Sequence, residues 1–457
     1  MMEDAGDRAG AGDRCGEADD ARRAGGDGDR ADEDRGGGQQ TPGGDRAFDR
    51  TPGQHDTGGP SSSLPAVSWR GYRLGGRCAH AAAIPSCRGV RAGTVNSIGQ
   101  MTYILAMADT LTRDHEGPVL IVGGYGTVGS ALTELAAPHW PLLLTGRNPE
   151  KGAALADKHG ATVRRWDLTD PAPFRAAVRA VIGTVNDPID RVLTAAVGAG
   201  VPYVDITRWT SRMTRAIAVA AVMKPRAPVL FSSAWMGGIT SVVAAALIAE
   251  RGGAAASVDI AVRWDMNDMA GIDSVDFMDR LGYDYEVRRG GLPVTVAPLT
   301  DPRIVNIAGS RTKVVRIDTP EQLTLPITLD VGTVSTRLGF SSGAATTALL
   351  AAKKAGLFRW GKGDRWTSVR RSLLYSPGEG GNAEIRVDVD GEGGRTSATV
   401  VDPRGQAHLT ALGGFLGLRR VLDPTGSEPG VTYPELHPDP ASILRSLPEH
   451  GVEVLRE

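Results

Sequence analysis

Three glycines, Gly124, Gly126 and Gly129, have the spacing G-x-G-x-x-G. In turns of this kind the first glycine permits a tight turn, the second lets the backbone approach a pyrophosphate, and the third lets a helix pack closely on a strand. The free N–H groups at the start of that helix attract phosphate. The pattern also occurs in plain connections, so its setting has to agree. The candidate cofactor-binding residues of the turn are Gly124, Tyr125, Gly126, Thr127, Val128 and Gly129.

The segments around the glycines supply that setting. Residues 119–122 form a short, continuous apolar run, which is typical of a parallel strand buried on both faces. A helix is expected from Ser130 to residue 136, and a second apolar run, residues 141–144, follows it. A strand, a glycine turn, a helix and a second strand together form the unit in which this motif binds dinucleotides.

Arg147 follows the second expected strand, where an NAD site usually carries Asp or Glu for the ribose 2′-hydroxyl. A guanidinium suits a 2′-phosphate instead. The sequence therefore predicts NADP(H) as the cofactor, with NAD(H) as the alternative. The other interpretation is that Arg147 is a solvated turn residue.

Strands and helices continue to alternate after this unit. Asn148 followed by Pro149 is a common helix start. The expected helices are 148–159, 171–179, 189–199 and 239–250, and the expected strands are 161–166, 180–185, 201–207 and 228–232. This order predicts an α/β fold with a Rossmann-type, doubly wound parallel sheet.

Polar side chains follow the third and fourth expected strands, and ligands of such sheets bind beyond the carboxyl ends of the strands. Asp167 follows the third strand and either contacts the adenine or caps the next helix. Asn186 and Asp187 follow the fourth strand and either lie beside the nicotinamide ribose or form a plain turn. All three are candidate cofactor-binding residues.

The fifth expected strand carries the candidate catalytic residues Tyr203, Asp205 and Arg208. Tyr203 and Asp205 are two residues apart and therefore lie on the same face of the strand. Asp205 could orient an amine, or take a proton if burial raises its pKa; the alternative is that it braces the following loop. Arg208 and Arg212 could clamp a substrate carboxylate by bidentate pairing, although arginines at such positions are more often surface residues.

Four aromatic residues lie near the same region of the sequence. Trp209 and Trp235 could form the wall of an apolar pocket, although a tryptophan is more often part of the core. Tyr283 and Tyr285 could line the cleft from the second half of the chain.

The positions of the cysteines and histidines in the sequence argue against thiol, metal and histidine-based catalytic sites. All three cysteines lie in the leading segment, so the rest of the chain has no thiol nucleophile and no disulfide. Cys78, His80 and Cys87 match no standard zinc spacing, and no metal is predicted. No histidine lies between His159 and His408, so a histidine acid or base is not expected.

Composition separates residues 1–100 from the rest. Their first part is rich in Gly, Asp, Arg and Ala and almost without Leu, Ile or Val, which predicts a disordered tail. The alternative is a mis-annotated start, with translation beginning at Met101 or Met107. The longest apolar run, residues 242–249, is too short for a membrane span, and no secretory or transit signal is recognised. A soluble cytoplasmic protein is expected, and the net charge of -2 gives no reason to expect nucleic acid or membrane binding.

The longer motifs resemble the saccharopine dehydrogenase-like family of NAD(P)-dependent oxidoreductases. They are VLIVGGYGTVG at 119–129, TGRNPEK at 145–151, AAVGAGVPYVDIT at 195–207 and the closing PGVTYPELHPDPASILRSLPEHGVEV, so the resemblance covers residues 117–457. One departure is Gly237-Gly238, where the family often has Pro-Gly. This departure weakens the assignment of substrate contacts near that turn.

The second half of the chain predicts an α+β substrate domain with a mixed sheet. Half-exposed strands are expected at 257–264, 294–297 and 312–317, a helix at 344–356, and a hairpin at 383–401. The expected domains are a cofactor-binding domain at 117–240, a substrate domain at 241–404 and, as the resemblance implies, a C-terminal segment at 405–457 that returns to the first domain.

The resemblance implies an NADP(H)-dependent enzyme that reduces an imine, or oxidises a secondary amine, on a small amino-acid-like substrate. One alternative is reduction of a carbon–carbon double bond on a carrier-bound lipid, which needs an open apolar groove. Another is a non-catalytic NADP(H)-binding sensor or scaffold. Because dimers are the commonest oligomers, a homodimer is expected.

Overall fold

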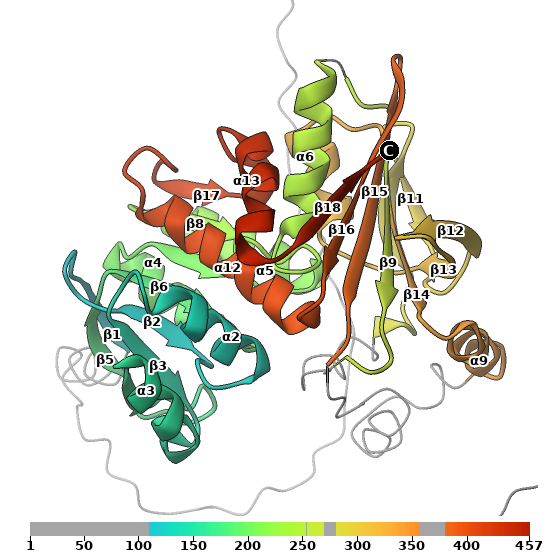
Figure 1. Cartoon of the computed structure of the whole chain (residues 1–457). Helices are drawn as coiled ribbons and strands as arrows, with labels where there is room; N and C mark the ends of the chain where they lie inside the picture. The colour runs from blue at the N-terminus through green and yellow to red at the C-terminus, as the bar shows by residue number, and fades with distance from the viewer. Residues whose placement is uncertain (1–108, 253, 269–279, 357–379) are drawn as a thin grey trace, which may run out of the picture. The chain divides into compact units, whose positions relative to one another are not determined.

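A seven-stranded parallel sheet organises the first half of the chain (Figure 1). The computed structural model describes residues 109–252, 254–268, 280–356 and 380–457, so the expected tail, residues 1–100, lies outside the described residues. The sheet has the order β17 (Gly430–Thr432), β8 (Pro228–Phe231), β7 (Tyr203–Asp205), β6 (Ala180–Gly183), β2 (Val119–Val122), β3 (Leu142–Gly146) and β4 (Thr162–Arg165). Counted along the chain this is 3-2-1-4-5-6 with one added strand, which confirms the predicted Rossmann-type sheet.

The central strands are continuous apolar runs because helices cover both faces of the sheet. Alternate residues of β2 point to opposite sides: Val119 and Ile121 pack in one core cluster, and Leu120 and Val122 in another. The first cluster includes residues of α2 (Thr127–Ala136) and α12 (Gly405–Leu422), and the second includes residues of α4 (Arg191–Ala199) and α5 (Thr210–Met223). Burial on both faces is what a parallel sheet of this kind requires.

The helix expected at residues 171–179 is wrong. This segment contains β5 (Arg175–Val178), which pairs in parallel with a strand the sequence did not reveal, β1 (Thr110–Arg113). The Asp109 carboxylate accepts a hydrogen bond of 2.7 Å from the Phe174 N–H, next to this pair. Ala and Arg favour a helix locally, but here tertiary pairing decides the backbone conformation.

The helix expected at 148–159 is present in two parts. A 3-10 turn, η1 (Pro149–Gly152), is followed by α3 (Ala153–His159). Asn148 is at the N-cap position of η1, as the helix-start pattern predicts, but its side chain makes no capping hydrogen bond.

A second seven-stranded sheet is mixed, as predicted. Only β14 and β9 pair in parallel within it, and the expected hairpin is β15 with β16. Its order is β12 (Arg303–Ile307), β13 (Ser310–Arg316), β14 (Thr333–Phe340), β9 (Ser257–Trp264), β15 (Ala383–Gly391), β16 (Gly394–Asp402) and β18 (Glu453–Arg456). A separate hairpin of β10 (Tyr285–Arg289) and β11 (Leu292–Val296) packs against β14, as does α8 (Glu321–Thr328).

The C-terminal residues join both sheets. Helix α12 contacts strands of the parallel sheet and of the mixed sheet, as Figure 1 shows. Strand β17 pairs with β8, and β18 pairs with β16. Between them lie η3 (Pro434–Leu436), α13 (Pro440–Ser446) and η4 (Leu447–His450), with α13 packed on α6 (Ile239–Arg251). The domain boundaries at residues 240 and 404 stay predictions.

The Gly237-Gly238 departure has a structural cause. Both glycines have positive φ angles, 63° and 92°. A Cβ at Gly237 would lie 2.4 Å from the Thr410 carbonyl oxygen of α12, and one at Gly238 would lie 2.4 Å from the Ser232 hydroxyl. Proline fixes φ near −65° and cannot adopt this backbone. Close approach of α12 therefore requires glycine at position 237, and the closeness of Ser232 and Pro434 requires it at position 238.

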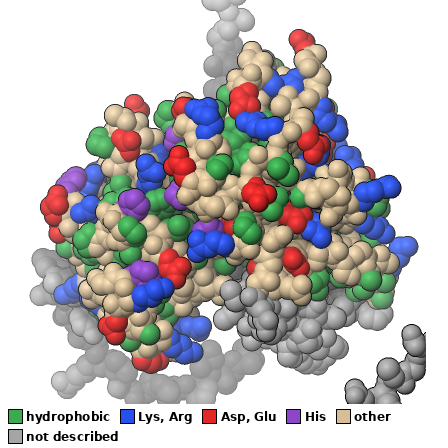
Figure 2. Space-filling view, in the orientation of Figure 1, with side chains coloured by type: hydrophobic (Ala, Val, Ile, Leu, Met, Phe, Trp, Pro, Cys, Tyr) green, Lys and Arg blue, Asp and Glu red, His purple; other side chains and the backbone are tan. Residues whose placement is uncertain are grey.

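Charged side chains of both signs are interspersed on the face drawn in Figure 2. That face has no large patch of one sign, in keeping with the net charge of -2. Among the described residues, no helix has the length and hydrophobicity needed to cross a membrane.

Candidate functional site

The glycine turn lies where the strand order of the parallel sheet reverses, with β2 between β3 and β6. The residue with the left-handed backbone is Gly123, with φ of 90°, and not Gly124 as the motif suggested. A Cβ at Gly123 would lie 2.3 Å from a Val185 methyl carbon. A Cβ at Gly124 would lie 2.9 Å from Leu144, so that glycine serves close packing. Ligands of doubly wound sheets bind at such reversal points.

The other two glycines have the geometry that the motif predicts. A Cβ at Gly129 would lie 2.1 Å from the Gly123 carbonyl oxygen, so only glycine lets α2 pack this closely on the turn. Gly126 is exposed, and the only atom near its missing Cβ is the same oxygen, at 3.3 Å. This contact would be tight for a Cβ, but within 4 Å the described residues place no other atom there. The open space fits a ligand that approaches the backbone, and the first turn of α2 has no acidic residue to repel phosphate.

Tyr125 links the glycine turn to the end of β3. Its ring lies so close to the backbone that a Cβ at Gly146 would be 2.4 Å from the hydroxyl oxygen, and one at Gly152 would be 2.5 Å from the ring. Glycine is therefore needed at positions 146 and 152, because any side chain there would collide with Tyr125. Arg147 follows Gly146 and is exposed, at the edge where the sequence predicts a 2′-phosphate.

Asp167 forms a local turn after β4. Its Oδ1 accepts hydrogen bonds from the Thr169 hydroxyl, at 2.8 Å, and from the Thr169 N–H, at 3.0 Å. These bonds, with the nearby Arg165, lower the pKa of Asp167. No helix follows, so the expected helix cap is wrong, while contact with the adenine stays a prediction. A pocket of about 540 Å³ lies beside this turn, lined by Leu168, Thr169, Ile189, Arg191 and Thr194 among others.

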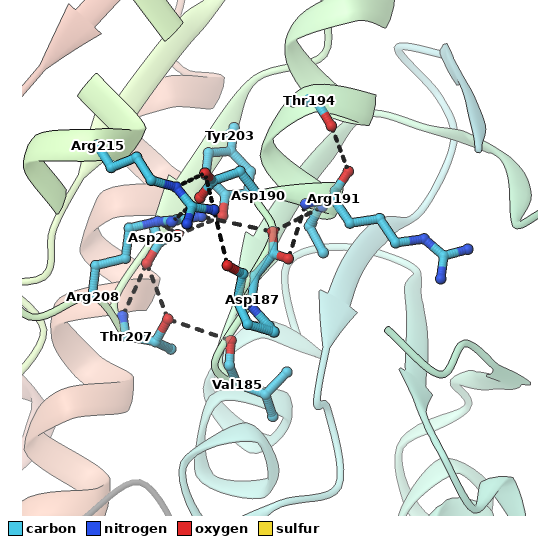
Figure 3. Close-up of polar contacts among 12 residues, drawn as sticks. Val185, Asp187, Asp190, Arg191, Thr194, Tyr203, Asp205, Thr207, Arg208 and Arg215 are labelled. Atoms are coloured by element: carbon cyan, nitrogen blue, oxygen red, sulfur yellow. Dashed lines mark hydrogen bonds and ion pairs between the residues drawn. The ribbon is translucent and has the colours of Figure 1, made fainter. Parts of the chain in front are cut away.

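Asp205 is the centre of a buried polar network at the carboxyl end of β7 (Figure 3). Its Oδ2 accepts the Tyr203 hydroxyl at 2.5 Å and Arg208 Nε at 2.7 Å. Its Oδ1 accepts the Thr207 N–H at 3.0 Å and the Ser233 hydroxyl at 3.2 Å. Only 1% of the Asp205 surface is exposed. Each oxygen of this carboxylate is thus already held by the protein.

Arg208 connects Asp205 to the loop after β6. Its guanidinium pairs with Asp190 and lies 3.7 Å from Asp187, and only 4% of its surface is exposed. Burial alone would lower the pKa of Arg208, but the surrounding acidic groups, Asp205 first among them, raise it above the ordinary value. Asp190 also accepts Arg215 Nε at 2.7 Å, as Figure 3 shows. Arg208 is therefore charged at neutral pH.

The remaining members of the network are equally enclosed. Both oxygens of Asp187 accept backbone N–H groups at the start of α4, from Arg191 and Val192, at 2.9 Å each. Burial raises the pKa of Asp187 despite these bonds. Burial, with the charge of Asp205, also holds the pKa of the Tyr203 hydroxyl well above its usual value, so Tyr203 stays a donor.

These contacts join the loops after β6 and β7, and the arrangement suits a brace. Asp187 caps α4, while Asn186 lies half-buried beside it at the carboxyl end of β6. The expected carboxylate clamp stays a prediction for Arg208, whose buried guanidinium already pairs with Asp190 and Asp205 and lies 3.7 Å from Asp187. A catalytic role for Tyr203, Asp205 and Arg208 stays a prediction, as do the cofactor roles of Asn186 and Asp187.

A second cluster of charges lies at the start of α5. The guanidinium carbon of Arg212 is 4.1 Å from the centre of the Trp209 ring, and that of Arg280 is 5.4 Å from it. Arg280 pairs with Asp318, which also accepts the Thr210 hydroxyl at 2.6 Å. The sequence pointed to Arg212 and Trp209 but missed Arg280 and Asp318, because neither belongs to a motif.

Tyr285 and Trp235 have clear structural partners. The Tyr285 hydroxyl donates to the Ile317 carbonyl at 2.7 Å, whereas Tyr283 is exposed. Trp235 packs against the main core, and its backbone N–H donates to Glu321 Oε2 at 3.3 Å. Glu321 is fully buried, and burial raises its pKa. It joins the β8–α6 turn to β14, because its other oxygen accepts the Thr336 hydroxyl at 3.1 Å.

Comparison with known proteins identifies the fold. Neither a protein-family model nor a curated protein matches the sequence. Apo saccharopine dehydrogenase (L-Glu forming) from Saccharomyces cerevisiae matches with a TM-score of 0.55, over 75% of this chain and 99% of that chain, at 14% sequence identity. The chain has the fold of saccharopine dehydrogenase. The resemblance inferred from the motifs is thus confirmed at the level of the fold.

A second solved structure is less similar. Amine dehydrogenase from Mycobacterium smegmatis matches over 71% of this chain and 98% of that chain, with a TM-score of 0.37 and 13% sequence identity.

Within the residues that the structure describes, no group of three or more His, Cys, Asp or Glu side chains could hold a metal ion. The Cys78, His80 and Cys87 set lies outside the described residues.

Proposed function

We propose that the protein is an NADP(H)-dependent oxidoreductase that reduces an imine, or oxidises a secondary amine, on a small amino-acid-like substrate. The observation that carries the proposal is the open backbone face of Gly126, at the point where the strand order reverses. A dinucleotide that approaches the backbone explains a glycine here, since the one contact of a Cβ within the described residues would be with the Gly123 carbonyl oxygen, at 3.3 Å.

Several residues fit the parts of such a cofactor. The N–H groups of Thr127 and Val128 lie in the first turn of α2, where no intrahelical carbonyl is in reach, and would bind the pyrophosphate. The guanidinium of Arg147 would pair with the 2′-phosphate. The pocket beside Asp167 would take the adenine, and the braced loop that holds Asn186 would lie beside the nicotinamide ribose.

When bound, the nicotinamide supplies or accepts the hydride, so the protein has to orient the substrate carbon and exclude water. A protonated imine needs only a hydride to become an amine. Such a reaction needs no proton from the protein. It therefore fits a site in which the Tyr203 hydroxyl donates its hydrogen bond to Asp205 and both side chains are buried. The role of the network is then to keep the loops after β6 and β7 in place around the reacting groups.

Reduction of a carbon–carbon double bond on a carrier-bound lipid is the second candidate. It calls for an open apolar groove beside the nicotinamide. The cluster at the start of α5 instead places two guanidinium groups against the Trp209 ring. Charged groups of this kind do not suit an apolar chain, because their burial by it would be costly. A non-catalytic NADP(H)-binding sensor would keep the glycine turn and Arg147 but show no turnover.

The test is a fluorescence titration of the full chain with NADPH and with NADH, for the wild type and the variant Arg147→Asp. We expect NADPH to bind at least about tenfold more tightly than NADH, since a lost charge-assisted pair with phosphate has an effect of that order. The variant should lose this preference. The matched control is Arg226→Asp, which reverses the charge of another exposed arginine and should bind as the wild type does.

Turnover is tested next, by mixing pairs of keto acids and amines with NADPH and following its absorbance. Oxidation of NADPH that needs both partners supports imine reduction. Failure of the wild type to bind either nucleotide would overturn the proposal altogether. Binding without turnover on any pair would favour the sensor.

A further inference from the structure

A cavity of about 740 Å³ lies beside α9 (Gly343–Lys354), in the half of the chain that carries the mixed sheet. Its described lining comes from residues 281–356 alone, mainly from α9 and from the loop that joins β11 to β12. Figure 1 shows α9 across the mixed sheet from β2 and α2, which flank the glycine turn. The volume is within the range of small-molecule sites, about 300–1,000 Å³. The cavity is therefore separate from the proposed cofactor site.

The inner wall of the cavity is apolar. Leu281 and Leu299 are each only 3% exposed, and Pro298 is buried as well. Leu350 and Ala351 add apolar surface from α9. A ligand with an apolar body would leave water for contact with these side chains, and the hydrophobic effect would favour its binding.

The two hydroxyl groups that line the cavity already donate to the backbone. The Thr300 hydroxyl donates to the Ala297 carbonyl at 2.6 Å, and the Thr347 hydroxyl donates to the Gly343 carbonyl at 2.9 Å. Each hydroxyl has only one proton to donate. A ligand with many acceptor groups, such as a sugar, would therefore find few donors along this wall, which favours an apolar ligand body.

The loop beside the cavity is held in a strained conformation. Leu299 and Asp301 have positive φ angles, 55° and 50°, which cost conformational free energy in residues other than glycine. The Leu299 N–H donates to the Arg316 carbonyl at 2.7 Å, and the Arg316 N–H donates to the Thr300 carbonyl at 3.0 Å. Strain that the surrounding structure maintains is common where a loop holds a ligand. The cavity is thus preformed.

Charged side chains line the cavity as well. Lys353 donates to the Pro298 carbonyl and so joins α9 to the loop. Lys313 is half-buried and Lys354 is exposed, and no ion pair connects either of them to a described residue. These two lysines outnumber Asp284, the one acidic side chain in the described lining. The lining therefore attracts an anionic group, which the flexible side chain of a lysine can meet without a fixed geometry.

We propose that this cavity binds a long-chain monocarboxylate. The apolar chain would lie against Leu281, Leu299 and Leu350, and the carboxylate would pair with Lys313 and Lys354. Each methylene group that is buried strengthens such binding, and a charge-assisted hydrogen bond holds the carboxylate. A long-chain cation or a short anion satisfies only one of these two requirements. The proposal does not depend on the proposed function, because no described residue of the lining belongs to the cofactor site.

The test is isothermal titration calorimetry of the full chain with dodecanoate, below the concentration at which it forms micelles. Dodecylamine carries the same chain with the opposite charge, and acetate carries the same charge without the chain. The variant Ala351→Trp fills the cavity from α9. Its control is Ala348→Trp, because Ala348 is exposed on the same helix and is not one of the lining residues.

A second variant tests the charges. It combines Lys313→Gln with Lys354→Gln and so removes both lysines that would pair with the carboxylate. The matched control combines Lys158→Gln with Lys224→Gln, which removes two exposed lysines elsewhere. Urea unfolding shows which variants are folded. If Ala351→Trp does not fold, the lysine variant still tests the site.

We expect one dodecanoate to bind per chain, at least about tenfold more tightly than dodecylamine, and acetate to give no measurable heat. Ala351→Trp should weaken dodecanoate at least about tenfold, and the lysine variant by about tenfold. Both controls should bind dodecanoate as the wild type does. NADPH affinity, measured on the same samples, should be the same in every variant.

Four results would overturn the inference. The wild type fails to bind dodecanoate, several molecules bind per chain with similar affinity, dodecylamine binds as tightly as dodecanoate, or folded Ala351→Trp and the lysine variant keep the wild-type affinity. Loss of NADPH binding in the wild type would instead refute the proposed function and leave this test unaffected.

Discussion

Replacing Asp205 by Asn distinguishes a bracing role from a catalytic one. The change keeps the shape of the side chain but removes its charge, and it turns one acceptor into a donor. Oδ2 accepts Arg208 Nε at 2.7 Å and the Tyr203 hydroxyl at 2.5 Å, and the pKa of Tyr203 is raised so far that its hydroxyl stays protonated. The asparagine therefore cannot satisfy all the donors that now converge on the carboxylate.

The magnitude follows from the burial of the pair. Breaking a buried ion pair by removing one partner costs about 3–5 kcal/mol. Arg208 keeps Asp190 and Asp187 as partners, so the low end applies. We expect Asp205→Asn to lower the free energy of unfolding by about 3 kcal/mol, which changes the folding equilibrium by roughly a hundredfold.

The assay is urea unfolding followed by tryptophan fluorescence. Asp157→Asn is the control, because Asp157 is exposed on α3, and a surface change of this kind alters the unfolding free energy by less than about 0.5 kcal/mol. NADPH affinity should also fall in Asp205→Asn, since the loops after β6 and β7 lose their connection. A variant as stable as the wild type, with unchanged NADPH binding but no turnover, would refute the bracing role and support proton transfer by Asp205.

Three further predictions concern cofactor binding, packing and pH. Gly126→Ala should leave the free energy of unfolding within about 0.5 kcal/mol of the wild-type value, because a φ of −78° suits alanine and the Cβ meets only one atom. The same variant should bind NADPH at least about tenfold more weakly than the wild type does. Wild-type affinity for NADPH would contradict the proposed approach of the cofactor to this backbone. Gly129→Ala should lower the unfolding free energy by about 1–3 kcal/mol or more, measured by urea unfolding. Because burial raises the folded-state pKa of Glu321 above 4.5, the folded state holds the proton more tightly, so stability should fall as pH rises from about 4.5 through that raised pKa. Glu321→Gln should flatten this slope and exposed Glu286→Gln should not; equal slopes in both variants would contradict the assignment.

The close approach of α12 explains why the C-terminal part of the chain matters to the parallel sheet. Gly413 meets the turn after β8 so closely that a Cβ would lie 2.4 Å from the Gly237 carbonyl oxygen. A Cβ at Gly417 would lie 3.1 Å from Val204 of β7. Because of this contact the helix covers the centre of the parallel sheet, and β17 then extends the sheet beside β8.

Local sequence determined the parts of the fold that depend on local chemistry. The continuous apolar runs of β2 and β8, the glycine spacing after β2, and the alternation of β9 each specify one kind of element, because burial on two faces, close packing and burial on one face demand different residue patterns. From these the order of elements, and so the Rossmann-type sheet, could be predicted.

Only the tertiary structure decided the pairings that no local pattern encodes. The segment that contains β5 has helix-forming residues but pairs with β1. Arg208 follows a motif that suggests a substrate clamp, yet Asp190 and Asp187 from another loop enclose it. Arg280 stands in no motif and still reaches Trp209, 71 positions earlier in the chain. Charge–charge contacts between distant segments depend on where the whole chain places them, and side-chain type alone does not determine that.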